Sequence, residues 1–341
     1  MRHSVYTVGI DISSDHFTTT VMNAEFQVTG TTTEFQNTPE GFSELLTWFR
    51  KLEVVPESAV VCMEATGVYG EHLCFFLASK HFHIAVEPPL KVKRSFHLSS
   101  HKNDTVDSRQ IAEYAHRFFD ELSFWQPNTD IIEQIKTLLT TRENLTAQLI
   151  ANQNAVKTLA RKHVRTQMAE QTHTDLIVHL KQKLETIDKE IKRLIDQDVS
   201  LRTMSSLLQS IPGVGLLLTA HLVCLTRGFT KPITAKQLAA YAGICPYERT
   251  SGSSLQKKPT SRGFGPSTLR KLLYLASLSV RTHTKQFQLY FLRKVAEGKS
   301  KRLVLNNIAN KLSRIICAVI KNKKQFITNY CSVNPLLLKN A

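Results

Sequence analysis

The chain has 341 residues, of which 42% are hydrophobic and 21% are charged, proportions typical of a globular protein with two or three domains. No run of about 18 apolar residues is present, which argues against a membrane span, and a strand pattern so close to Met1 leaves no room for a signal peptide. The six cysteines show neither a Cys-x-x-Cys pair nor zinc-finger spacing, so we expect reduced thiols in a cytosolic protein.

The net charge of +16 is distributed unevenly along the chain. Residues 1–199 hold more acidic than basic side chains, whereas residues 200–341 hold 23 Lys and Arg and only two acids, Glu248 and Glu297. A region with so few acids needs a polyanion to neutralise it. We therefore expect nucleic acid as the partner. A membrane surface is the weaker alternative, because no basic amphipathic helix with an aromatic face stands alone.

The segment Val5–Ser13 is predicted to form a buried strand with Asp11 near its end. A polar turn and the apolar run Phe17–Met22 follow, which predicts a β-hairpin. An ionised Asp in a buried strand is costly unless it is paired or binds a cation. This pattern suggests a ribonuclease-H-like sheet whose carboxylates hold Mg²⁺, and it also fits the nucleotide fold of sugar kinases and actin.

Strands and helices alternate over the next eighty residues, as in an α/β domain. The expected elements are a helix capped by Thr38 and ending near Lys51, a strand over Ser58–Glu64, a helix over His72–Lys80 and a strand over His83–Glu87. Glu64 is the second carboxylate at the end of a buried strand.

A helix beginning at Asn103 or Asp104 adds two more acids, Asp104 and Asp107, which lie one turn apart on one face. Alone, these acids would be explained as stabilising the helix dipole. Together with Asp11 and Glu64 they could hold two Mg²⁺ ions about 4 Å apart for phosphoryl transfer. The preceding basic residues could contact backbone phosphates; they are Lys91, Lys93, Arg94 and Lys102.

The residues around these acids resemble the DEDD transposases of insertion-sequence family one-ten (IS110/IS1111-type). The matching segments are Gly-Ile-Asp11, Glu64-Ala-Thr-Gly-Val-Tyr and Lys-Asn-Asp104-Thr-Val-Asp107. Thr105 and Ser108 stand where the family usually has Ala. The resemblance implies a RuvC-like domain that contains the tetrad. Piv-type DNA invertases are relatives, and members of the family are described as bridge-RNA-guided recombinases.

Residues 128–200 contain no Gly or Pro, which favours long helices. Apolar residues spaced alternately by three and four run from Ile177 to Leu194 and form a heptad seam. A looser apolar pattern precedes it, and the polar stretch Thr166–Thr174 predicts a turn between two helices. We expect a coiled-coil hairpin whose seam packs against a second chain; the alternative is a helical bundle within one chain.

The first part of the basic region contains glycines followed by an apolar run. Ser210–Gly215 before Leu216–Leu225 predicts a helix-hairpin-helix-like turn whose glycine amides approach a phosphate, and a plain turn between packed helices is the alternative. Thr234–Gly243 is predicted to be a short capped helix. Helices over Leu269–Arg281 and Leu303–Lys321 are expected to place a basic face over an apolar core.

Between these helices, Ile244–Ser254 is predicted to be a polar loop that grips phosphate. From the residues alone, Ser251 is one of several hydroxyls that could bind phosphate there. The resemblance instead implies a nucleophilic serine at Ser251, five residues after Pro246 and followed by Gly252. The segment Pro259–Gly265 departs from the usual sequence motif of the family. The basic residues expected to contact nucleic acid here are Arg249, Lys257, Lys258, Arg262, Arg270 and Lys271.

We therefore predict an α/β plus all-α protein. It would have a RuvC-like catalytic domain over residues 1–127, coiled-coil helices over 128–200, a small basic helical transposase domain over 201–325 and a tail over 326–341. The resemblance implies a bacterial, cytoplasmic, nucleoid-associated enzyme that mobilises an insertion sequence. It further implies a composite site of both domains, Mg²⁺-dependent cleavage and strand exchange through a covalent phosphoserine, an element-encoded structured guide RNA, and a homo-oligomer, either a dimer or a tetramer on DNA.

Two alternatives come from other functional classes. A metal-dependent structure-selective nuclease, such as a Holliday-junction resolvase, would use the four acids and water without Ser251. A nucleic-acid-binding protein without catalytic activity would use the acids only as caps and ion-pair partners.

Overall fold

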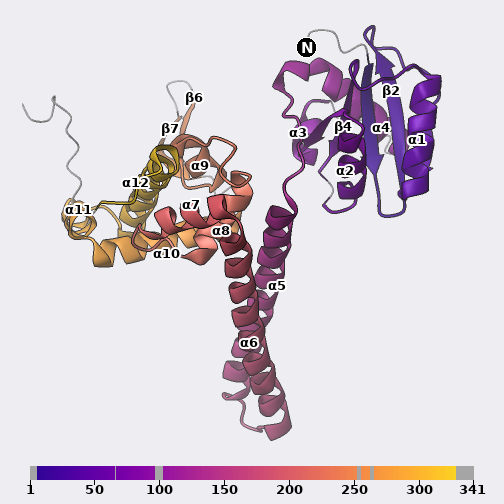
Figure 1. Cartoon of the computed structure of the whole chain (residues 1–341). Coiled ribbons are helices and arrows are strands. Elements are labelled where there is room, and N and C mark those ends of the chain that lie inside the picture. Colours follow the sequence, from indigo (N-terminus) through magenta and orange to yellow (C-terminus); the bar gives the residue numbers. More distant parts are fainter. Residues whose placement is uncertain (1–5, 66, 97–102, 252–254, 262–264, 328–341) are drawn as a thin grey trace, which may run out of the picture. The chain divides into compact units, whose positions relative to one another are not determined.

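The computed structural model describes residues 6–327 except residue 66 and residues 97–102, 252–254 and 262–264. The chain forms two compact units, Met1–Pro127 and Asn128–Ala341. Figure 1 shows the strands of the first unit and the helices of the second.

A five-stranded mixed sheet in the order β3-β2-β1-β4-β5 forms the centre of the N-terminal unit. β1 (Tyr6–Ile12) and β2 (His16–Asn23) pair in antiparallel fashion, which confirms the predicted hairpin. β1 also pairs in parallel with β4 (Ala59–Glu64), which pairs in parallel with β5 (His83–Glu87). β3 (Thr33–Gln36) was not predicted and pairs with β2 at the edge of the sheet. The carboxyl ends of β1, β4 and β5 therefore meet at one edge.

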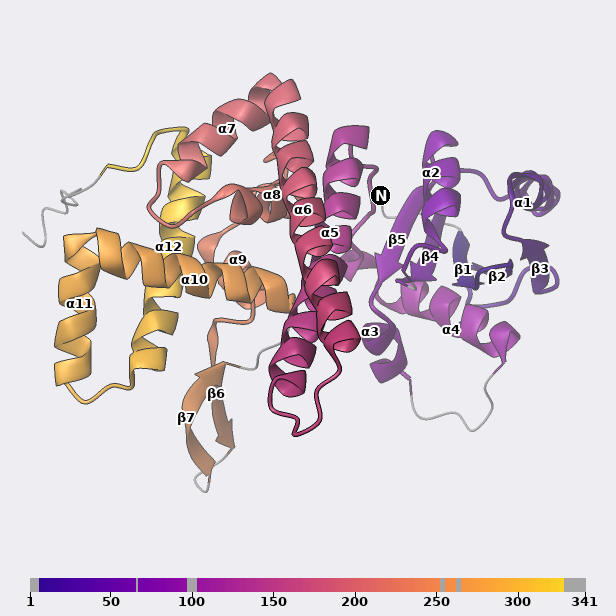
Figure 2. The same ribbon diagram turned by 90° about the horizontal axis from the view of Figure 1, so that it is seen from below.

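Helices cover both faces of this sheet, as Figure 2 shows. On one face, α1 (Pro39–Lys51) and α2 (Glu71–Ser79) share an apolar core with the sheet. α1 begins as predicted, because the Thr38 hydroxyl accepts a hydrogen bond from the Gly41 amide. On the other face, α4 (Asp104–Arg117) packs in a smaller apolar cluster with β4 and β5. The short helix α3 (Pro89–Arg94) was not predicted.

Two long helices, α5 (Asp130–Leu159) and α6 (Gln167–Gln197), form the predicted helical hairpin of the C-terminal unit (Figures 1 and 2). The turn occupies residues 160–166, so the predicted turn over Thr166–Thr174 is wrong beyond its first residue. The reason is that residues 167–174 are mostly polar but contain no Gly or Pro, and they form the largely exposed first two turns of α6.

The heptad seam of α6 is buried within the single chain. Leu180 and Leu184 are buried without any second copy, and further along the seam Ile191 packs with Ile135 of α5. Arg142 of α5 adds a bidentate hydrogen bond to Asp188, with its Nε 2.6 Å from Oδ1. The expectation that this seam packs against a second chain is therefore corrected to the intramolecular alternative. A homo-oligomer stays a prediction and would need another surface.

Shorter helices complete the C-terminal unit. They are α7 (Val199–Gln209), α8 (Leu216–Leu225), α9 (Ala235–Tyr241), α10 (Ser267–His283), α11 (Lys285–Ala296) and α12 (Lys301–Asn322); α11 was not predicted. Among the described residues, α12 is the one helix whose length and composition would suit a membrane span. Its residues Ile308, Leu312 and Ile316 are fully buried, so its apolar face fills the core of the unit.

The strands β6 (Pro246–Ser251) and β7 (Leu255–Ser261) form a two-stranded antiparallel hairpin that projects from these helices (Figure 2). The predicted polar loop over Ile244–Ser254 is therefore wrong for most of its length. The Ser and Gly content of this segment, and the lysines that follow it, concealed two short runs of strand-compatible residues separated by Gly252–Ser254, a typical hairpin spacing. Residues 252–254 lie outside the described residues.

Candidate active site

Asp11 and Glu64 lie next to each other at the carboxyl edge of the five-stranded sheet. The parallel register of β1 and β4 aligns Ile10 with Met63, and each acid is the next residue of its strand. Side chains alternate along a strand, so Asp11 and Glu64 are on the same face as Gly9 and Cys62, which contact α4. The register of the sheet thus brings together two of the four predicted acids.

Helix α4 brings Asp104 and Asp107 to the same edge. Its first turn is fixed by Asn103, whose side chain accepts a hydrogen bond from the Val106 amide at 2.8 Å. The Nε2 atom of His16, at the start of β2 and beside the end of β1, lies 3.8 Å from an oxygen of Asp104. The N-terminus of α4 is therefore at the end of the sheet that carries Asp11.

The backbone of α4 rests directly on β1 because residue 9 is glycine. A Cβ atom at Gly9 would lie 2.1 Å from the carbonyl oxygen of Ser108 and 2.2 Å from the amide nitrogen of Ala112. The buried hydroxyls of Ser108 and Thr20 are 2.8 Å apart and join the same helix to β2. These contacts hold the second and third turns of α4 against the sheet, so Gly9 and Thr20 position the helix that carries the acids without being ligands themselves.

The four acids share an edge, yet they do not converge in the described structure. Among the described residues, no group of three or more His, Cys, Asp and Glu side chains could hold a metal ion. Asp104 faces His16, which also lies 3.9 Å from Glu34. The donor chemistry fits Mg²⁺, since all four side chains offer carboxylate oxygens.

Glu87 is a fifth carboxylate at this edge, and sequence reasoning missed it as a site residue. It is aligned with Glu64 in the β4–β5 register and is only 4% exposed. Its charge is balanced by Lys91, whose Nζ atom lies 3.1 Å away. The signal was present as an acid at the end of a third strand with Lys four residues later. Lys91 was predicted to contact phosphate, and here its amine is engaged by Glu87.

The other basic residues predicted in this unit differ in accessibility. Lys93 and Arg94 are exposed on α3 and are free to approach a phosphate backbone. Lys102 lies outside the described residues.

Ser251 is the last residue of β6, and its backbone pairs with Leu255 of β7. Arg249 is aligned with Lys257 in the same hairpin, and Lys258 is the next residue of β7. Arg262 lies outside the described residues. The backbone therefore places the predicted nucleophile at the end of a hairpin strand, with basic residues along both strands.

The base of this hairpin is anchored to α12. The Nδ2 atoms of Asn306 and Asn310 both donate hydrogen bonds to the carbonyl oxygen of Ile244, each at 3.0 Å. Ile244 is buried and comes two residues before β6. Two amides on one carbonyl fix the chain at the point where it leaves the helical core. Sequence analysis singled out neither asparagine, because they lie about sixty residues from Ile244.

Two further hydrogen bonds hold the preceding carbonyls. Arg270 of α10 donates from Nη1 to the carbonyl of Ala242 at 3.3 Å, and the hydroxyl of Ser261 donates to the carbonyl of Gly243. Arg270 was predicted to contact nucleic acid, and in the structure its guanidinium supports the base of the hairpin. Lys271, the next residue, is exposed.

The glycine-containing turn between α7 and α8 packs against α10. Gly213 has a φ of +85°, and a Cβ atom there would lie 2.7 Å from the carbonyl oxygen of Ala276. Backbone conformation and close packing together explain this glycine. A phosphate-binding role for the turn stays a prediction.

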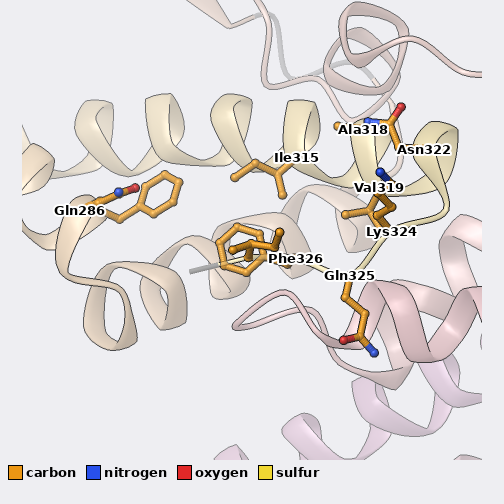
Figure 3. Close-up of a pocket in the computed structure, with 10 residues that line it drawn as sticks. Gln286, Ile315, Ala318, Val319, Asn322, Lys324, Gln325 and Phe326 are labelled. Carbon is orange, nitrogen blue, oxygen red and sulfur yellow. The ribbon is translucent and has the colours of Figure 1, made fainter. Parts of the chain in front are cut away.

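A cavity of about 890 Å³ in the C-terminal unit lies between α11, α12 and residues 324–327 (Figure 3). Its lining is mostly apolar and includes Ile315, Val319 and Phe326. None of the predicted site residues lines it.

Comparison with known proteins gives two family matches and several relatives. Residues 8–164 match the DEDD-type IS110 transposase model, and residues 205–292 match the model described as transposase of the IS116/IS110/IS902 family. A pilin gene-inverting protein from Moraxella lacunata is 28% identical over 324 residues, which are 94% of this chain and 97% of that protein. Its counterpart from Moraxella bovis has the same identity and coverage. A 43.6 kDa protein of insertion element IS110 from Streptomyces coelicolor is 29% identical over 35% of this chain and 29% of its own length.

Proposed function

The chain belongs to the IS110 family of transposases, and from this premise we propose that it cleaves and rejoins DNA strands through a covalent bond to Ser251. The observation that carries the metal-dependent cleavage step is the alignment of Asp11 with Glu64 at one sheet edge, beside the first turn of α4. The serine step is supported by the position of Ser251 at the end of β6, within the second family match. The relatives named as pilin gene-inverting proteins support rejoining as well as cleavage, since inversion of a segment requires both.

In this proposal Asp11, Glu64, Asp104 and Asp107 hold two Mg²⁺ ions. When bound, such ions supply positive charge that offsets the charge developing on the phosphate under attack. The chain's own part is to present the carboxylates. β1 and β4 fix two of them through their register, and the contact of α4 with Gly9 fixes the helix that carries the other two.

Ser251 supplies the nucleophile in this proposal. Its Oγ attacks the phosphorus of the scissile diester and gives up its proton, the Oγ–P bond forms, and the bond from phosphorus to the leaving strand oxygen breaks while that oxygen takes a proton. The phosphate remains a diester, so its bond energy is retained without ATP. A strand hydroxyl then attacks the same phosphorus, and the serine oxygen leaves with a proton.

The proposal includes a second nucleic-acid partner besides DNA. It is supported by the positive charge of residues 200–341, which contain 23 Lys and Arg and two acids. This partner is a structured RNA encoded by the element, which would select DNA by base pairing while the protein contacts backbone phosphates. RNA recovered with the purified protein should then map beside its own gene. Recovery of random cellular RNA would contradict guidance. The active form in this proposal is a homo-oligomer.

The test of the serine mechanism is a duplex carrying the joined ends of the element, nicked near the crossover so that cleavage traps the adduct. The parent protein should form a covalent adduct on the Ser251 peptide, identified by mass spectrometry. Ser251→Ala should bind the duplex normally and form none, whereas the matched variant Ser253→Ala should keep most activity. Cleavage without an adduct would establish the metal-dependent nuclease instead, and an adduct on another residue would reject Ser251.

A further inference from the structure

Four cationic side chains lie where α11 meets α12, and two of them face the ring of Tyr290. The Nζ atom of Lys311 lies 3.7 Å from the ring centroid, and the guanidinium carbon of Arg293 lies 5.9 Å from it. Lys294 follows Arg293 on α11, and Arg314 is one turn beyond Lys311 on α12. All four lie beyond residue 292, where the second family match ends.

Among the described residues, Glu297 is the one carboxylate that forms an ion pair with these four cations. Glu297 accepts a hydrogen bond from Lys294 Nζ at 2.6 Å and lies 3.9 Å from Arg293 Nε. The only other acid in residues 200–341 is Glu248. The cluster therefore has a surplus of positive charge that its own part of the chain does not neutralise.

Lys311 experiences this surplus directly. Burial and then the like charges of Arg293, Arg314 and Lys294 lower the pKa of its ammonium group. Its contact with the face of the Tyr290 ring orients the ammonium without neutralising it. An anion placed between Lys311 and the two arginines would relieve the repulsion.

We infer that Arg293 and Lys311, which face Tyr290, form together with Arg314 a binding site for the phosphodiester backbone of nucleic acid. Arg offers a planar fork for phosphate oxygens and Lys offers a point charge, a pairing suited to backbone contact without sequence selection. The inference rests on the nucleic-acid partner of the proposed function, and it concerns binding alone. Lys294 is held by Glu297 and takes part only when that carboxylate is removed.

The test compares the double variant Lys311→Gln/Arg314→Gln with a control that loses the same charge elsewhere, Lys181→Gln/Lys183→Gln on the exposed surface of α6. Fluorescence anisotropy with a 20-base-pair duplex and a 20-nucleotide single-stranded RNA, over a range of salt concentrations, gives affinity and its salt slope. The slope should fall by about 1–2 in the double variant, because each neutralised phosphate contributes about 0.7–0.9. The probe with the larger loss identifies the nucleic acid that occupies the site.

A second variant is expected to raise the affinity for nucleic acid instead of lowering it. Glu297→Gln removes the carboxylate that holds Lys294, so affinity for the same probe should rise severalfold. A double variant indistinguishable from its control, or Glu297→Gln without a gain, would overturn the site. If the parent protein binds no nucleic acid at all, the proposed function itself fails, which separates the two outcomes.

Exposed leucines near the cluster make a membrane-binding control necessary in this experiment. Leu289 and Leu292 of α11 are each 57% exposed, and cations beside apolar side chains can also bind a membrane surface. Phosphatidylglycerol vesicles are therefore added as a competitor. Displacement of the nucleic-acid probe by vesicles, dependent on Lys311 and Arg314, would overturn the assignment to nucleic acid.

Discussion

In the N-terminal unit, Asp11 and Glu64 stand on β1 and β4, two strands with a hydrogen-bonded neighbour on each side in a five-stranded sheet. In the C-terminal unit, Ser251 ends a strand whose one described partner is β7. The positions of the acids are fixed by backbone hydrogen bonds to the neighbouring strands on both sides. The serine depends on hydrogen bonds at the base of a projecting hairpin. The molecule thus fixes one set of candidate catalytic groups rigidly and holds the other through a few anchor points.

The largest expected effect concerns the rigid set. Asp11→Asn and Glu64→Gln keep the shape of each side chain and remove the charge that a hard cation needs, so strand cleavage should fall by about a thousandfold or more while the fold is kept. Cleavage of labelled duplex in Mg²⁺, together with thermal unfolding, measures both properties. The matched variant Glu25→Gln, in an exposed turn, should leave cleavage unchanged.

Retained cleavage in Asp11→Asn, or cleavage in EDTA, would show that the sheet edge is structural. The difference between the sheet edge and the hairpin would then have no bearing on catalysis, and the acids would serve only as helix caps and ion-pair partners.

The second prediction tests how rigid the sheet edge is. Gly9→Ala places a methyl group against the backbone of α4, so the helix must move and the free energy of unfolding should fall by more than about 2 kcal/mol. Chemical denaturation measures this change. The control is Gly215→Ser, because a side chain at Gly215 has open space and serine suits a helix N-cap. Equal stability of the two variants would mean that α4 is not docked through Gly9.

The smallest effect is expected at the base of the hairpin. Asn306→Ala/Asn310→Ala leaves the buried Ile244 carbonyl without its two donors, a loss of about 1–3 kcal/mol. Because these amides are already engaged by the carbonyl at the base of the hairpin, we expect them to orient it, so the rate of adduct formation on Ser251 should fall more than affinity for DNA. Rapid-quench kinetics and anisotropy separate the two. Asn307→Ala is the control in the same helix, since its side chain has no hydrogen bond to the described residues.

Equal losses of affinity and rate would indicate that Asn306 and Asn310 act only on stability. The orientation of the hairpin would then not depend on these two hydrogen bonds, and the proposed difference between the two units would be wrong.

The same contrast explains what could be predicted from the sequence. In the N-terminal unit, periodic apolar residues and a helix cap lie close together in the chain, so the hairpin, α1 and the strand ends carrying Asp11 and Glu64 were predictable. β3 could not be predicted because it has only four residues and a single buried side chain, Phe35. The pattern of the acids predicted that they could act together, but it could not predict that Asp104 faces His16.

In the C-terminal unit the determining contacts are distant in sequence. The heptad seam was recognised, yet periodicity cannot tell whether α5 or a second chain covers Leu184. The polar composition around Ser251 concealed β6 and β7, and nothing local to Asn306 or Asn310 indicates that both reach Ile244. Local pattern predicts elements, whereas these anchors depend on how the helices pack.

A two-stranded hairpin is marginally stable by itself, so its amide hydrogens should exchange with solvent through local opening. Amides in β1 or in the buried turns of α12 should exchange far more slowly, because their opening requires unfolding of a core. A nucleic acid that grips β6 and β7 would slow exchange there without altering the slow core amides. Hydrogen–deuterium exchange would then report substrate engagement at the serine separately from global stability, and unchanged exchange in β6 on DNA binding would place the DNA elsewhere.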